Sequence, residues 1–102
     1  MYLKTKTDFD AAVGATVDGS KPLVIEFEAE GSLLCKKIGP VYETIVANYP
    51  ELTLKKIDVD SNAEAAQAAN IETHPTFKVY MNGTEVNEMR GNSEAGLVNL
   101  LN

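Results

Sequence analysis

Residues 75–86 read PTFKVYMNGTEV. Two stretches rich in β-branched and aromatic residues, 76–81 and 84–86, lie on either side of the dipeptide Asn82-Gly83. Asn-Gly between two such stretches is the strongest short signal for a β-hairpin. The segment therefore predicts two antiparallel strands joined by a two-residue turn.

Upstream of the hairpin, segments typical of strands alternate with segments typical of helices. The further strands are expected at residues 1–4, 23–27 and 52–59, and the helices at 8–17, 33–49, 62–69 and 94–102. The strand at 1–4 should be a short edge strand, whereas the next two read as buried runs. The order βαβαβαββα predicts an α/β protein with helices on both faces of a mostly parallel sheet.

The helices are predicted from capping residues and apolar spacing. Thr7, Ser32 and Ser61 are the expected N-caps. Glu64 stands three residues after Ser61 and would complete a capping box. Pro40 lies inside the second predicted helix and should kink it. In the first helix, apolar residues at helical spacing should face the core: Phe9, Val13 and Val17.

Length and composition are typical of one small, soluble domain over residues 1–102. An apolar fraction of 44% is enough to build a core. The net charge of −6 argues against nucleic acid and anionic membrane surfaces as partners. No apolar run reaches the length of a bilayer span, no signal peptide is evident, and Cys35 is the single cysteine, so we expect a cytoplasmic protein. No residue spacing fits a metal or a bound phosphate, so we expect no metal and no cofactor.

These features together resemble the thioredoxin family over essentially the whole chain. The matching segments are Val24-Ile25-Glu26-Phe27, Cys35-Lys36-Lys37-Ile38-Gly39-Pro40, Lys56-Ile57-Asp58-Val59-Asp60, Pro75-Thr76-Phe77, Asn82-Gly83 and Gly91. The resemblance implies a thioredoxin fold with a central, mixed but mostly parallel, five-stranded sheet flanked by four helices. It also implies that Pro75 is in the cis form beside the active-site loop.

The start of the second predicted helix departs from the family pattern. Redox-active members carry Trp-Cys-Gly-Pro-Cys there, and this chain carries Gly31-Ser32-Leu33-Leu34-Cys35. The resemblance places Ser32 at the nucleophile, Cys35 at the resolving cysteine and Glu26 at the buried acid. Cysteine-to-serine is also a common laboratory change, but three further departures in the same five residues favour a naturally divergent loop.

The loss of one cysteine decides the chemistry that we expect. A thiolate must attack the substrate disulfide and a second thiol must then resolve the mixed disulfide. Ser32 cannot supply the thiolate, because its hydroxyl is essentially un-ionised at neutral pH. The sequence therefore predicts that the chain is not a dithiol-disulfide oxidoreductase.

Cys35 and Glu26 each leave two interpretations open. Cys35 is either a small buried apolar residue or a monothiol nucleophile that forms mixed disulfides with glutathione or a partner. Glu26 is either neutralised or paired with Lys56 on the neighbouring strand, which we favour, or a proton acceptor for Cys35.

Two further positions flank the expected active-site loop. His74, the only histidine, is either a proton acceptor for Ser32 or Cys35 or, as we favour, a surface residue beside Pro75. Of Leu33 and Leu34, either one folds inward or both join Pro75 in an apolar patch for a partner.

The predicted function is therefore protein binding through a face made of Gly31, Leu33, Leu34, His74 and Pro75. The alternative is a monothiol redox enzyme, similar to a protein-disulfide reductase or linked to glutathione, that uses Cys35. A third interpretation is a homodimer tied through Cys35.

Overall fold

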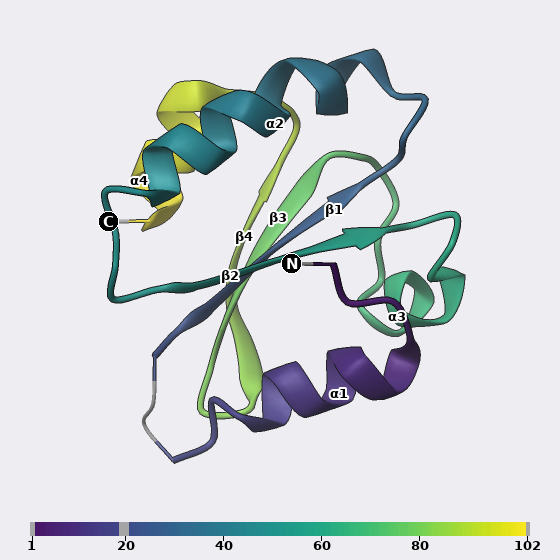
Figure 1. Cartoon of the computed structure of the whole chain (residues 1–102), viewed down its shortest axis with the longest axis vertical. Helices are drawn as coiled ribbons and strands as arrows, with labels where there is room; N and C mark the ends of the chain where they lie inside the picture. The colour runs from purple at the N-terminus through teal and green to yellow at the C-terminus, as the bar shows by residue number, and fades with distance from the viewer. Residues whose placement is uncertain (1, 19–20, 102) are drawn as a thin grey trace.

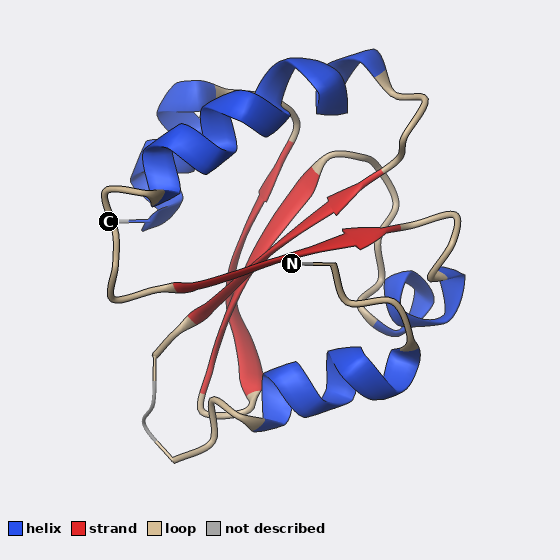
Figure 2. Cartoon of the chain, in the orientation of Figure 1, coloured by secondary structure: helices blue, strands red, loops and turns tan. Residues whose placement is uncertain are grey.

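The computed structural model describes residues 2–18 and 21–101, so the predicted features at residues 1, 19, 20 and 102 lie outside it. The elements follow the order α1 (Lys6–Gly14), β1 (Leu23–Glu28), α2 (Leu33–Val46), β2 (Thr53–Asp58), α3 (Ala63–Ala68), β3 (Thr76–Met81), β4 (Thr84–Arg90), α4 (Glu94–Leu101). Figure 1 shows a twisted sheet between two helical layers, with α2 and α4 on one side and α1 and α3 on the other. Figure 2 shows the same three layers by secondary structure.

The sheet has four strands within the described residues, in the order β2-β1-β3-β4. β1 and β2 are parallel, whereas β1 and β3, and β3 and β4, are antiparallel. The sheet is mixed, as expected, but the expected five strands and the mostly parallel pairing are wrong. After α3 the chain enters β3 at the same end of the sheet at which β2 finishes, so β3 runs opposite to β1 and β2.

The missing fifth strand is the predicted N-terminal one. Tyr2 forms only an isolated bridge to Lys56, and the Leu3 backbone N–H donates to the Lys56 carbonyl at 2.9 Å. The chain then enters α1, whose N-cap is Thr5. The segment lies parallel to the edge of β2, but it turns into the helix before a ladder can form.

The hairpin prediction is confirmed. β3 and β4 pair in an antiparallel register across Asn82 and Gly83. Their φ angles are 53° and 81°, so both lie in the left-handed region that a type I′ turn requires.

Two helices, α1 and α3, have boundaries or caps that differ from the predictions. α1 starts after Thr5 instead of Thr7 and ends at Gly14, which leaves Val17 61% exposed instead of in the core. α3 follows Asn62, and no Ser61–Glu64 capping box forms. The Ser61 backbone N–H donates to Asp58 instead, at 3.2 Å.

Two apolar cores fill the space on either side of the sheet. Alternate residues of β1 face opposite layers. Leu23, Ile25 and Phe27 belong to the core under α1 and α3, and Val24 to the core under α2 and α4. This alternation places Glu26 on the α2 side. Among the described residues, no helix is long and apolar enough to cross a membrane.

Candidate functional site

Ser32 fixes the start of α2. Its backbone is extended, with φ −80° and ψ 123°, and its Oγ accepts a hydrogen bond from the Cys35 backbone N–H at 3.3 Å. The predicted N-cap is therefore confirmed. A side chain at this position satisfies one of the backbone donors that a helix start leaves without an intrahelical partner. Ser32 contributes a structural hydrogen bond at the place where the family nucleophile is expected.

Cys35 lies on the inward side of α2. Its side chain is 5% exposed, and its Sγ accepts a hydrogen bond from the Ala29 backbone N–H at 3.4 Å. Ile38, three residues further along, is buried in the core under α2 and α4. The thiol is therefore shielded in this conformation, and a reagent or a substrate disulfide needs a local opening to reach it.

Leu33 and Leu34 lie on the outward side of the same turn. Their exposed fractions are 72% and 45%, so the interpretation in which one of them folds inward is wrong. Inward positions of this turn are already occupied by Cys35 and Ile38. The loop residue Gly31 is also exposed, and it has open space around the position of a Cβ.

The segment before β3 contains His74 and Pro75, two members of the predicted binding face. The peptide bond between His74 and Pro75 is cis, and His74 is exposed. Pro75, however, is fully buried. Its ring is therefore not accessible to a partner, and Pro75 does not belong to the exposed face that was predicted.

Glu26 is fully buried on the α2 side of the sheet. Neither carboxylate oxygen has a hydrogen-bond partner among residues 2–18 and 21–101. Burial, helped by repulsion from Glu28, raises the pKa of Glu26 from its ordinary 4.5 to about 7, although attraction to Lys56 lowers it in part. The Glu26 carboxyl is thus close to half protonated at neutral pH, and Cys35 is not its hydrogen-bond partner.

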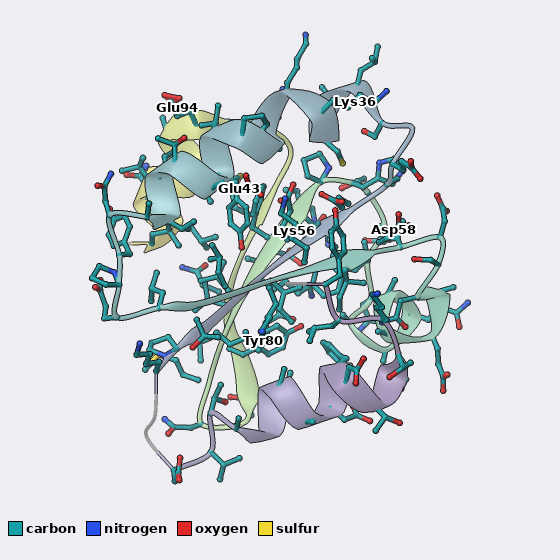
Figure 3. All side chains as sticks on the ribbon, in the orientation of Figure 1. Lys36, Glu43, Lys56, Asp58, Tyr80 and Glu94 are labelled. Atoms are coloured by element: carbon teal, nitrogen blue, oxygen red, sulfur yellow. The ribbon has the colours of Figure 1, made fainter. Side chains whose placement is uncertain are left out.

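Lys56 forms its ion pair with Glu43 and not, as expected, with Glu26. It stands opposite Glu26 in the β1–β2 register, but its Nζ bonds to Glu43 of α2 at 2.9 Å. Burial lowers the pKa of Lys56, yet the hydrogen bond to Glu43 and the nearby acids raise it by more. Figure 3 shows Lys56 and Glu43 between the sheet and α2. Glu43 was missed because its contact with Lys56 is tertiary and leaves no spacing pattern in the sequence.

Within the described part of the chain, no three His, Cys, Asp or Glu side chains are grouped so that they could hold a metal ion. The site thus consists of one shielded thiol, one unpaired buried carboxyl and two exposed leucines. It contains one cysteine, so it cannot form an internal disulfide.

Comparisons with known proteins agree on one family. A sequence model described as thioredoxin matches residues 1–102. The chain is 40% identical to a thioredoxin of Geodia cydonium over 97 residues, which are 94% of this chain and 90% of the relative. It is 34% identical to a thioredoxin H-type of Chlamydomonas reinhardtii, covering 92% and 84%.

Solved structures give the same result. The thioredoxin of Fasciola hepatica superimposes with a TM-score of 0.91 at 29% identity, covering 98% of this chain and 94% of that one. A thioredoxin of Plasmodium falciparum superimposes with a TM-score of 0.89 at 31% identity, covering the same shares. Both values describe a fold shared over nearly the full length of each chain.

Proposed function

The chain belongs to the thioredoxin family, and from this premise we propose that it is a protein-binding member without dithiol-disulfide oxidoreductase activity. It binds through the exposed start of α2, with Leu33 and Leu34 at the centre and with Gly31 and His74 beside them. It works in a reducing compartment such as the cytoplasm, where a free thiol persists.

The first part of the proposal rests on stoichiometry. Disulfide exchange by two thiols ends with an intramolecular disulfide in the enzyme. This sequence has one cysteine. The side chain at the nucleophile position is a serine hydroxyl, which already accepts the N-cap hydrogen bond.

The second part rests on one observation, the exposure of two adjacent leucines. Burying a leucine side chain contributes on the order of 1.5–3 kcal/mol, and about 1.4 kcal/mol changes an affinity tenfold. A partner that covers Leu33 and Leu34 therefore gains tenfold or more in affinity from this contact, with no covalent step.

The alternative is a monothiol redox protein that uses Cys35. One contact favours it, because the hydrogen bond that the Ala29 backbone N–H donates to Sγ holds the sulfur in one position. The burial of Cys35 disfavours it. A disulfide-linked dimer is disfavoured for the same reason, since Sγ would have to reach a second chain.

The binding test compares two variants that separate the leucines from the thiol. Leu33→Asp combined with Leu34→Asp should weaken association with a partner, or self-association, by about tenfold or more, because the free energy of burying the two leucines is lost. Cys35→Ser should leave association nearly unchanged. Pull-down and sedimentation report association, and circular dichroism confirms that both variants are folded.

If Cys35→Ser abolishes association and the leucine pair has no effect, a covalent thiol mechanism replaces the binding proposal.

A separate assay addresses the lost activity. The chain should not turn over in the reduction of a protein disulfide by a thioredoxin-reductase system, and turnover within about tenfold of an ordinary thioredoxin would disprove the claim.

A further inference from the structure

The outward side of α2 carries charge as well as apolar surface. Lys36 and Lys37 are both exposed and follow directly on the leucines and Cys35. Lys37 stands four residues after Leu33, so the two side chains lie on the same side of the helix. Figure 3 labels Lys36 at the start of α2.

These two positive charges are not neutralised by the described residues. No hydrogen bond or ion pair involves the ammonium group of Lys36 or of Lys37 in the described part of the chain. Lys6 and Lys78, by contrast, bond to Asp10 and Glu85. Glu43, the next acid along α2, is bonded to Lys56. On a chain of net charge −6, the start of α2 is therefore a local positive site.

The nearest acid on the other side of the leucines also faces elsewhere. Glu30 precedes α2 in the chain, and it lines a separate hollow together with Tyr2, Lys4 and Asp58. Its carboxylate is thus grouped with the N-terminal segment and not with Lys36 and Lys37.

The outward side of α2 continues into an apolar hollow of about 400 Å³ between α2 and α4. Its lining residues are Pro40, Val41, Thr44, Ile45, Glu94 and Val98. Val41 and Thr44 follow Lys37 by four and seven residues, so they continue the same stripe of the helix. Glu94 lies at the end of this layer remote from Lys36 (Figure 3). The stripe is therefore basic at its start and apolar, with one acid, at its other end.

We infer that the partner of this face is a protein segment that carries acidic side chains beside apolar ones and lies along the outward side of α2. Its acids face Lys36 and Lys37, its apolar side chains cover Leu33 and Leu34, and one apolar side chain enters the hollow beside Val41 and Thr44. This inference rests on the proposed function and adds the chemistry of the partner. Opposite charges across an interface select the partner and fix its orientation.

The test uses three fluorescein-labelled peptides with the same leucine positions. The residues between the leucines are Asp and Glu in the first peptide, Ser and Gln in the second, and Lys and Arg in the third. Fluorescence polarisation with the whole chain measures affinity. The acidic peptide should bind about tenfold or more tightly than the basic one, and added salt should reduce this difference because it screens exposed charges.

Variants of the chain assign the preference to the lysines. Lys36→Glu combined with Lys37→Glu should weaken binding of the acidic peptide by about tenfold. The matched control is Lys4→Glu combined with Lys55→Glu, which changes the net charge equally. Lys55 lines a hollow beside α1, on the opposite face of the sheet. This control should change the affinity by less than about twofold at moderate salt. Thr44→Arg should weaken the binding of all three peptides, because the arginine would fill the hollow that an apolar side chain of the peptide enters.

The outcomes separate the two proposals. If all three peptides bind equally and all lose affinity with Leu33→Asp and Leu34→Asp, the acidic partner is wrong and the binding function stands. If the control pair weakens binding as much as the Lys36 and Lys37 pair, the preference reflects net charge and the inference fails. If no peptide shows binding that depends on the leucines, the proposed function itself fails.

Discussion

The two sides of α2 have opposite environments although they share the same turns of one helix. The inward side holds Cys35, Ile38 and Tyr42, which are all buried. The outward side holds Leu33 and Leu34, both exposed, and two lysines without an acidic partner among the described residues. The width of the helix therefore separates the single cysteine thiol from the exposed apolar surface. Binding at one side therefore requires no access to the other.

Truncation of one apolar residue on each side should give the largest contrast. Ile38→Ala should lower the free energy of unfolding by about 2–5 kcal/mol, because it opens a cavity in a packed core. Leu33→Ala should change it by less than about 0.5 kcal/mol, because the side chain is mostly in water already. Urea denaturation of both variants measures the difference. Equal losses would mean that Leu33 is packed and not available to a partner.

The next contrast concerns the charge buried beneath α2. The folded protein favours the protonated form of Glu26, since its pKa is raised from 4.5 to about 7. The penalty for burying the carboxylate is absent below pH 4.5, grows as the pH rises towards 7 and is complete above that pH. A difference of this size corresponds to roughly 3 kcal/mol, at about 1.4 kcal/mol per pKa unit. The wild-type protein should lose this stability between about pH 4.5 and 8.

Glu26→Gln removes the titrating group and should remove this part of the pH dependence. Unfolding in urea at several pH values gives the slope for the variant and for the wild type. Glu64→Gln, at an exposed position of α3, is the matched control and should keep the wild-type slope. If Glu26→Gln also keeps that slope, Glu26 is not the group that carries the charge penalty under α2.

The smallest expected effect is at the boundary between the two sides. Ser32→Ala removes the oxygen that accepts the Cys35 backbone N–H and should cost about 1 kcal/mol of stability. Ser32→Asn keeps a capping oxygen and should cost less. Thermal unfolding compares the two variants. If both are as stable as the wild type, the serine has no capping role.

Local signals in the sequence were enough to predict several features. The Asn82-Gly83 turn and the Ser32 N-cap depend on neighbouring residues only, and both were predicted correctly. The family resemblance supplied the fold, which the solved structures confirm. It did not supply the strand count, because the N-terminal segment bends into α1 after a single bridge.

Features that depend on tertiary contacts were not predictable. Lys56 stands opposite Glu26 in the register, but it bonds to Glu43 from the helix above. Pro75, which the resemblance led us to expect beside the active-site loop, is enclosed. In both cases the deciding contacts come from elements far apart in the sequence, whose packing no local pattern records.

The most direct test of the central claim is the alkylation rate of Cys35. We expect Cys35 to react slowly with iodoacetamide in the native protein and fast in denaturant, because the thiol is buried on the inward side of α2. If access needs an opening that costs about 3 kcal/mol, the native rate should be about a hundredfold lower. If native Cys35 reacts faster than a free thiol at neutral pH, the thiol is not shielded, and the result favours a monothiol enzyme.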